Sequence, residues 1–114
     1  MGMIVGTIPS TPITVGGVML DTAHRKLKGR KGEIILEGSR QTEILHILMR
    51  RADNLVSFGE LFLQLYGNET IKRRNSLKTF IHHLSRHLKD VCDDDVFIES
   101  IRGKGYVLRM TPPF

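Results

Sequence analysis

The sequence predicts a single α+β domain, and three observations support this prediction. Short strand-like runs separated by glycine-containing turns occupy the first third of the chain. Three segments with apolar residues at helical spacing follow them. The chain then closes with two strand-like runs around a glycine-rich stretch. A length of 114 residues fits one domain with a modest core.

The N-terminal part predicts a leader and a first hairpin. Residues 1–12 contain glycines and prolines and lack the basic front of a signal peptide, so we expect a flexible leader. Ile13–Val15 and Val18–Leu20 flank Gly16 and Gly17, a pair typical of a two-residue hairpin turn. The folded domain is expected over 13–110, with a tail over 111–114.

A second hairpin is predicted before the helices. A polar stretch leads to the strand-like run Glu33–Leu36, and the segment from Gly29 to Gly32 predicts the turn. The basic run Arg25–Lys31 fits a nucleic-acid or nuclear-import patch. A solvated hairpin with Leu27 pointing inward is the preferred interpretation.

Two helices are predicted in the middle of the chain. The first starts near Ser39 and runs to about Arg51, and its apolar stripe is formed by Ile44, Leu45, Ile47 and Leu48. The second carries a capping box, in which Ser57 is the N-cap and Glu60 follows three residues later. Gly67 is a typical C-terminal stop for this helix.

The third helix is predicted over about 75–90, with Asn75 or Ser76 as its cap. Its apolar stripe consists of Leu77, Phe80, Ile81, Leu84 and Leu88. The opposite face carries Lys78, Thr79, His82, His83, Arg86 and Lys89. From Thr70 to Lys89 there are six Lys or Arg residues and no acid. The chain therefore has a basic amphipathic segment as well as a formal net charge of +5 and a pI of about 9.7, which favour a polyanionic partner.

The last structural unit is a hairpin over about 97–109. Gly103 and Gly105 supply the positive φ or close backbone approach that a tight turn requires, and Gly103-Lys104 fits a type II′ turn. Such a turn would project Arg102 and Lys104 outward while Ile101 and Tyr106 anchor the strands. Strands, three helices and a terminal hairpin, in this order, are the layout of a winged helix-turn-helix.

Four stretches from Val18 to Leu108 resemble, in order and spacing, the DNA-binding domain of OmpR/PhoB-type transcription regulators. "LDTAHRKLKGRKGEIIL" is similar to the family's N-terminal hairpin. "VSFGELFLQLYG" is similar to "VSREELLxxVWG", and "NSLKTFIHHLSRHL" to "RTVDVHIxRLRKKL". "IESIRGKGYVL" is similar to "IxTVRGxGYRL", the most specific match. Asn75, Lys78, Phe80 and Ser85 depart from the family's usual residues, so a different base preference is expected.

The resemblance implies that the third helix enters the major groove of double-stranded DNA and that the hairpin is a wing on the backbone or minor groove. The residues implied to face DNA are Asn75, Ser76, Lys78, Thr79, His82, His83 and Arg86 on the helix, with Ser100 and Arg102 on the wing. The resemblance also implies a contact of loop 68–74 with RNA polymerase and head-to-tail pairing on DNA.

Charge and side-chain chemistry divide these candidates. Lys78, Arg86, Lys89, Arg102 and Lys104 suit phosphate contacts, whereas Asn75, Ser76, Thr79 and His82 suit base edges. If five to seven phosphates are neutralised, the logarithm of the affinity should fall with the logarithm of the salt concentration at a slope near −5 to −6.

The sequence also leaves two alternatives to DNA binding open. "RGKGYVL" faintly resembles an RNA-binding RRM motif, and a winged domain can serve protein–protein contacts instead of DNA. No nucleophile, base and oxyanion site is assembled, so no enzyme and no cofactor are expected. His83 and His87 lack an evident third metal ligand. Asp93–Asp95 is expected to be a solvated turn, and the single Cys92 to be structural.

We expect the protein to be located in the cytoplasm, in association with the nucleoid. No apolar run approaches the ~20 residues that span a bilayer, so no membrane contact is expected within this chain. The family usually adds a receiver domain before this module, or a transmembrane segment after it. The chain is thus an excised domain, the cytoplasmic part of a membrane-anchored regulator, or a complete small regulator, and Met1 with the leader favours the last two.

Overall fold

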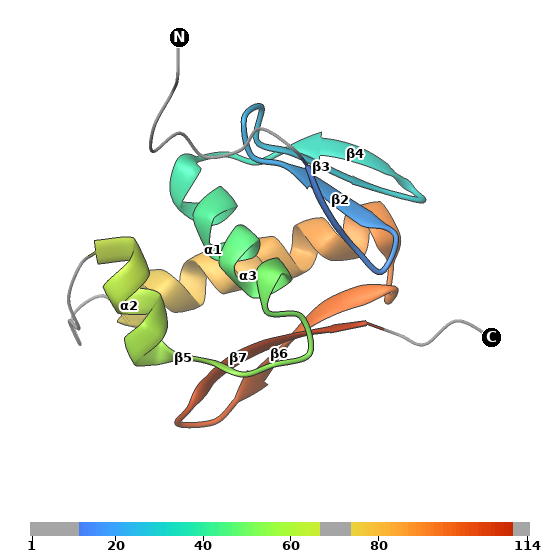
Figure 1. Ribbon diagram of the computed structural model, residues 1–114. Helices are drawn as coiled ribbons and strands as arrows, with labels where there is room; N and C mark the ends of the chain where they lie inside the picture. Colours follow the sequence, from blue (N-terminus) through green and yellow to red (C-terminus); the bar gives the residue numbers. More distant parts are fainter. Residues whose placement is uncertain (1–11, 67–73, 111–114) are drawn as a thin grey trace, which may run out of the picture.

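The computed structural model describes residues 12–66 and 74–110. Two antiparallel sheets enclose a layer of helices, with the N-terminal sheet on one side of that layer and the C-terminal sheet on the other (Figure 1). The predicted α+β class is confirmed. Of the predicted leader, only Pro12 is described. The tail 111–114 and most of the loop 68–74 lie outside the described residues.

The N-terminal sheet contains both predicted hairpins. Its strands run in the order β1-β2-β3-β4, with bounds Ile13–Val15, Val18–Asp21, Lys26–Gly29 and Gly32–Ile35. Gly16 and Gly17 both have positive φ, 57° and 84°, as a type I′ hairpin turn requires. Leu27 is fully buried, so the inward orientation predicted for it is confirmed.

The first two helices lie close to their predicted positions. Helix α1 spans Ser39–Arg50, the short strand β5 spans Val56–Ser57, and α2 spans Phe58–Tyr66. Half of the predicted capping box is present, because Ser57 Oγ accepts the Glu60 N–H at 3.1 Å. The Glu60 carboxylate turns instead toward the Ser57 hydroxyl and the Arg51 guanidinium. Gly67, the predicted stop of α2, lies outside the described residues.

Helix α3 spans Arg74–Cys92 and leads into the C-terminal hairpin. Because α3 already begins at Arg74, Asn75 and Ser76 lie in its first turn, and the prediction that one of them is the N-cap is wrong. Strands β6 (Val96–Ile101) and β7 (Gly105–Met110) pair, and β5 adds to β7, so the C-terminal sheet has the order β5-β7-β6.

The core lies between the two sheets and is formed mainly by leucines. Leu45 and Leu48 from α1, Leu84 from α3 and Leu108 from β7 are all fully buried in one cluster. Each such side chain contributes about 1.5–3 kcal/mol of burial free energy. Within the described ranges, none of the helices combines the length and the hydrophobicity needed to span a membrane.

Candidate nucleic-acid interface

The exposed face of α3 carries the predicted DNA-facing side chains. Leu77, Ile81, Leu84 and Leu88 are buried on the inner face. On the outer face Ser76, Lys78, Thr79, His82, Arg86 and Lys89 are exposed, and His83 is half-buried. Asn75 belongs to the first turn of α3, but its side chain lies outside the described part. The amphipathic pattern therefore separates core residues from polar residues as predicted.

The tip of the β6–β7 hairpin presents two further cations. Ser100, Arg102 and Lys104 are all exposed. The turn is closed by the Lys104 N–H, which donates to the Ile101 carbonyl at 2.9 Å. Gly103 is the third residue of this turn and has φ 74°, as type II turns require at that position. The predicted type II′ turn, with Gly103 as its second residue, is therefore wrong by one residue.

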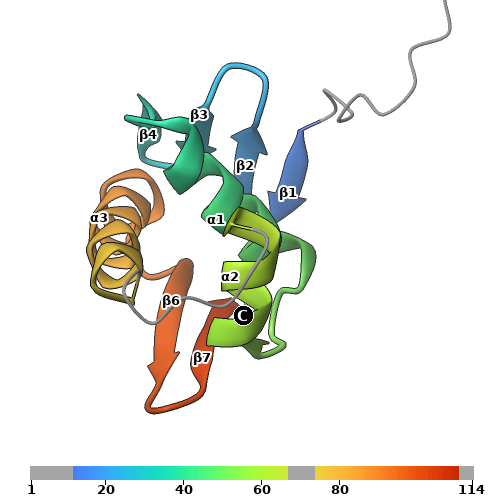
Figure 2. The same ribbon diagram turned by 90° about the vertical axis from the view of Figure 1, so that its left-hand side faces the viewer.

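Helix α3 and the β6–β7 hairpin are neighbours in space. Strand β6 packs against α3, and Figures 1 and 2 show the hairpin beside the helix with its tip pointing away from the rest of the molecule. Phe58 holds the hairpin close to its tip, because its N–H donates to the Lys104 carbonyl at 3.1 Å and its ring meets Tyr106 edge-on. A basic helix face and a basic hairpin tip thus belong to one connected unit.

Among the described residues, three of the five cations between Arg25 and Lys31 are ion-paired, whereas four of the five on α3 after Ser76 and at the hairpin tip are not. Lys26 pairs with Glu33 across β3 and β4, and Arg30 and Lys31 pair with aspartates that follow α3. Lys89 on α3 pairs with Asp94, and both side chains are largely exposed. In contrast, several cations make no ion pair with any described acid: Arg25, Lys28, Arg50, Lys78, Arg86, Arg102 and Lys104. Four of these lie on α3 or at the hairpin tip.

The aspartates after α3 make ion pairs that the sequence pattern does not predict. Arg30 Nε donates to Asp95 Oδ2 at 2.7 Å, and Lys31 Nζ lies 3.7 Å from Asp93 Oδ2. The side chains of Asp93, Asp94 and Asp95 are 44%, 80% and 37% exposed, so the prediction of a solvated turn is confirmed. Its ion pairs with the β3–β4 turn were not predicted. No local signal reveals this pairing, since Arg30 and Asp95 are 65 positions apart.

The histidines of α3 have different surroundings. His82 is exposed, whereas His87 lies on the side of the helix that faces Glu37, with 3.8 Å between His87 Nε2 and Glu37 Oε1. His87 Nε2 is buried without a hydrogen bond. Across the described parts of the chain, no group of three or more His, Cys, Asp or Glu side chains could hold a metal ion.

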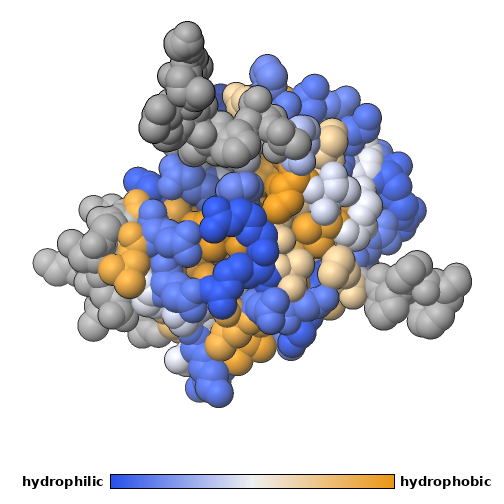
Figure 3. Space-filling model, viewed as in Figure 1, coloured by the Kyte–Doolittle hydropathy of each residue, from blue (hydrophilic) through white to orange (hydrophobic). Residues whose placement is uncertain are grey.

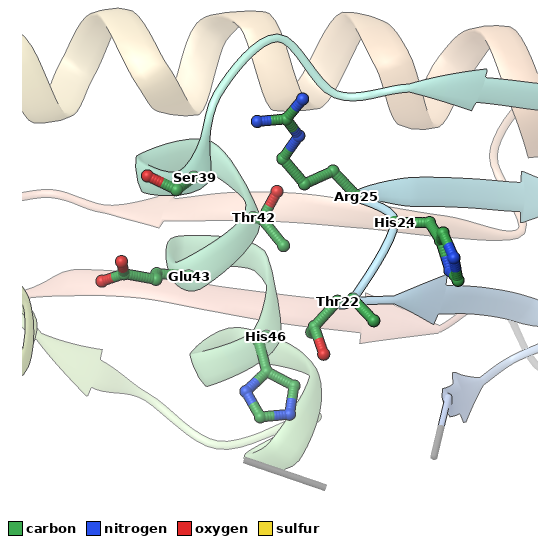
Figure 4. Close-up of a pocket in the computed structure, with 8 residues that line it drawn as sticks. Thr22, His24, Arg25, Ser39, Thr42, Glu43 and His46 are labelled. Carbon is green, nitrogen blue, oxygen red and sulfur yellow. The ribbon is translucent and has the colours of Figure 1, made fainter. Parts of the chain in front are cut away.

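A separate cavity of about 390 Å³ lies between α1 and the β2–β3 connection. Figure 4 shows Arg25 and His24 on one side of it, and Ser39, Thr42, Glu43 and His46 along α1 on the other. Burial, with a smaller effect of Arg50, lowers the pKa of His46. The lining contains one fixed cation, Arg25, and the Glu43 carboxylate, and the cavity does not belong to the α3 and hairpin surface.

The face that carries α1 is mostly hydrophilic, with hydrophobic areas near α2 and near the β6–β7 hairpin (Figure 3). In the described part of the chain, the exposed large hydrophobic residues are Ile35, Leu55, Leu63 and Phe97. They come from β4, the α1–β5 connection, α2 and β6 respectively.

Solved structures share this architecture. The DNA-binding domain of CpxR from E. coli aligns with a TM-score of 0.74 at 19% identity, covering 90% of this chain and 100% of that chain. The DNA-binding domain of Klebsiella pneumoniae RstA, solved in complex with RstA box, aligns with a TM-score of 0.71 at 21% identity. That alignment covers 87% of this chain and 97% of the RstA chain. These similarities establish the winged helix-turn-helix fold.

Sequence comparison gives the family. The response regulator ArlR of Staphylococcus aureus is 27% identical over 97 residues, which cover 85% of this chain and 43% of ArlR. This chain thus spans less than half the length of that relative. The family model described as "Transcriptional regulatory protein, C terminal" matches residues 32–108. The chain belongs to this OmpR/PhoB-type family of DNA-binding winged helix-turn-helix domains.

Proposed function

We propose that this chain is a sequence-specific regulator of transcription that binds double-stranded DNA, with α3 in the major groove and the β6–β7 hairpin on the backbone or minor groove. The observation that supports this most is the set of cations without described acidic partners on these two adjoining elements. Lys78 and Arg86 lie on the helix, and Arg102 and Lys104 lie at the tip. Phosphates are the ligands that unpaired, exposed cations in such an arrangement suit best.

The proposed roles follow from side-chain chemistry. Lys78, Arg86, Lys89, Arg102 and Lys104 neutralise phosphates and fix the register of the helix. Lys89 exchanges its exposed partner Asp94 for a phosphate at small cost, because exposed ion pairs contribute only about 0–1 kcal/mol. Asn75, Ser76, Thr79 and His82 read base edges in the first turns of α3, while His83 and Ser100 lie at the margins of the contact.

A pair of matched double variants tests the proposal. Lys78→Glu with Arg86→Glu should weaken binding to a selected duplex by about 100-fold or more, since two contacts become repulsive. Lys28→Glu with Arg50→Glu lowers the net charge by the same four units at sites on β3 and α1. This control should change affinity by less than about threefold. Equal losses in both variants would show that only net charge matters, and no loss in the first would remove α3 from the interface.

A competition experiment tests whether the chain prefers double-stranded DNA or single-stranded RNA. Duplexes selected from random DNA should outcompete single-stranded RNA of the same length for the wild-type chain, because α3 fits the major groove of B-form DNA. Preference for the RNA would overturn the proposal in favour of an RNA-binding module.

Pairing and further contacts are part of the same proposal. We expect two copies to bind a direct repeat head to tail, so a duplex with two half-sites should give two cooperative shifts in a gel. Loop 68–74 is proposed to contact RNA polymerase, and the chain to act in the cytoplasm on the nucleoid. The complex of the RstA domain with RstA box supports duplex DNA as the class of partner.

A further inference from the structure

The β3–β4 turn lies against the junction between α3 and β6. In Figure 1 this turn, the C-terminal end of α3 and the start of β6 meet at the same side of the molecule. Three residues, 93–95, join the helix to the hairpin. Any movement of the hairpin relative to the helix has to pass through this short connection.

Backbone contacts fix the β3–β4 turn to the last turn of α3. The Lys31 N–H donates to the Val91 carbonyl at 2.8 Å, which satisfies one of the carbonyls that a helix leaves unpaired at its C-terminus. Gly29 approaches so closely that a Cβ there would lie 2.9 Å from the Val91 carbonyl carbon and 3.0 Å from Cys92 Cβ. A side chain at position 29 would therefore separate the turn from the helix.

Backbone hydrogen bonds within residues 89–95 hold the junction between α3 and β6 in a defined conformation. Asp93 has φ 60°, the left-handed conformation that often ends a helix, and its N–H donates to the Lys89 carbonyl at 3.0 Å. The Asp95 N–H donates to the Cys92 carbonyl at 3.1 Å. These bonds orient both carboxylates toward the β3–β4 turn.

Arg30 bridges the two ends of the junction. Its Nε donates to Asp95 Oδ2 at 2.7 Å, and its Nη2 lies 3.9 Å from Asp93 Oδ2. The hydrogen bond with Asp95 raises the pKa of the guanidinium. The Arg30 side chain is 60% exposed, so these pairs add little to global stability. Their effect is to restrict the path of the chain between α3 and β6.

We propose that Arg30 is a positioning residue for DNA binding, which sets the orientation of the β6–β7 hairpin relative to α3 through Asp95. This inference rests on the proposed function, because it assumes that one duplex engages both elements. When the bridge is broken, α3 still enters the groove, while Arg102 and Lys104 reach their phosphates less often.

Asp95→Asn is the decisive variant, because a purely electrostatic effect and a positioning effect predict opposite changes in DNA affinity. Removing an acid from a DNA-binding protein should strengthen binding if only charge matters. If the bridge positions the hairpin, Asp95→Asn and Arg30→Gln should both weaken binding to the selected duplex by about twofold to fivefold. Both should also make the salt slope less negative by up to about 1, because the hairpin contacts its phosphates less often.

Lys26→Gln is the matched control for Arg30→Gln. It removes one cation and one exposed ion pair from the same hairpin, with Glu33, but leaves the junction intact. It should keep the wild-type affinity, salt slope and melting temperature. A third variant, Arg30→Asp with Asp95→Arg, restores an ion pair of reversed polarity and should recover most of the lost affinity.

The outcomes separate this inference from the proposed function. If the wild-type chain fails to bind duplex DNA, the proposed function is wrong. If the wild-type chain binds but Asp95→Asn binds as tightly or more tightly, the positioning role of Arg30 is overturned while the proposed function stands. If Arg30→Gln weakens binding and Asp95→Asn does not, Arg30 contacts a phosphate directly and the inference is wrong.

Discussion

Gly105 on β7 lies directly against the backbone of Val56 on β5. A Cβ atom at position 105 would clash with the Val56 carbonyl group, at 2.9 Å from its carbon, and would lie 2.8 Å from Ser57 Cα. Both obstacles are backbone atoms, which cannot rotate away as a side chain can. Because β5 leads straight into α2, this contact ties the β6–β7 hairpin to the second helix.

The two glycines of the hairpin should therefore respond differently to alanine. Gly105→Ala should lower the free energy of unfolding by about 2–3 kcal/mol, since the new methyl group forces β5 and β7 apart. Gly103→Ala meets open space and only has to hold φ 74°, so its cost should be about 1 kcal/mol. Urea unfolding of both variants measures the difference. An equal loss of unfolding free energy in the two variants would contradict the close approach of β5 and β7.

The sequence was sufficient for features that depend on local pattern. The 3.6-residue period of Leu77, Ile81, Leu84 and Leu88 gave the orientation of α3, and all four are buried. The Gly16-Gly17 pair gave a tight turn because both positions require positive φ. The exposed positions of Arg102 and Lys104 also follow from a local pattern, because Gly103 and Gly105 predict a tight turn there.

Features that depend on tertiary contact were not predictable in this way. The bridge of Arg30 to Asp95 joins segments whose separation in the chain carries no pattern, and charged residues at turns are ordinarily solvated. The start of α3 at Arg74 and the register of the Gly103 turn were each misplaced by one or two positions, because several neighbouring residues suit caps and turns equally.

Salt dependence should identify the phosphate contacts of the hairpin tip. Lys104→Gln should make the slope of log affinity against log salt less negative by about 1, and it should weaken selected and unrelated duplexes alike. Lys28 on β3 is also exposed and makes no ion pair with a described acid, so Lys28→Gln is the matched control and should leave the slope unchanged. Titrations at several salt concentrations, followed by fluorescence anisotropy, measure both slopes. An unchanged slope for Lys104→Gln would exclude the tip from phosphate contact.

The thiol of Cys92 should be inert in the folded protein. Cys92 is fully buried, its Sγ donates to the Leu88 carbonyl at 3.2 Å, and burial raises the pKa of the thiol. Reaction with a disulfide reagent such as Ellman's reagent needs the thiolate, so it should be at least about 100-fold slower in buffer than in denaturing urea. As a control, Ser100→Cys in a Cys92→Ala background places a thiol at an exposed site and should react at the rate of a free thiol. Fast reaction of native Cys92 would mean that the end of α3 opens readily.

Protonation of His46 should destabilise the fold. Burial is the larger cause and Arg50 the smaller cause of the lowered pKa of His46, so the folded state takes up its proton at a lower pH than the unfolded chain, whose imidazole titrates near 6.5. Below that pH the unfolded chain binds more protons, and the free energy of unfolding falls as the pH is lowered toward the pKa of the folded state. His46→Gln removes this loss and should stabilise the protein relative to wild type at about pH 5 but not at about pH 8. Arg50→Gln should recover only the smaller part of the loss, because burial remains. Urea unfolding at the two pH values measures the effect, and identical pH dependence in wild type and His46→Gln would show that His46 titrates alike in both states.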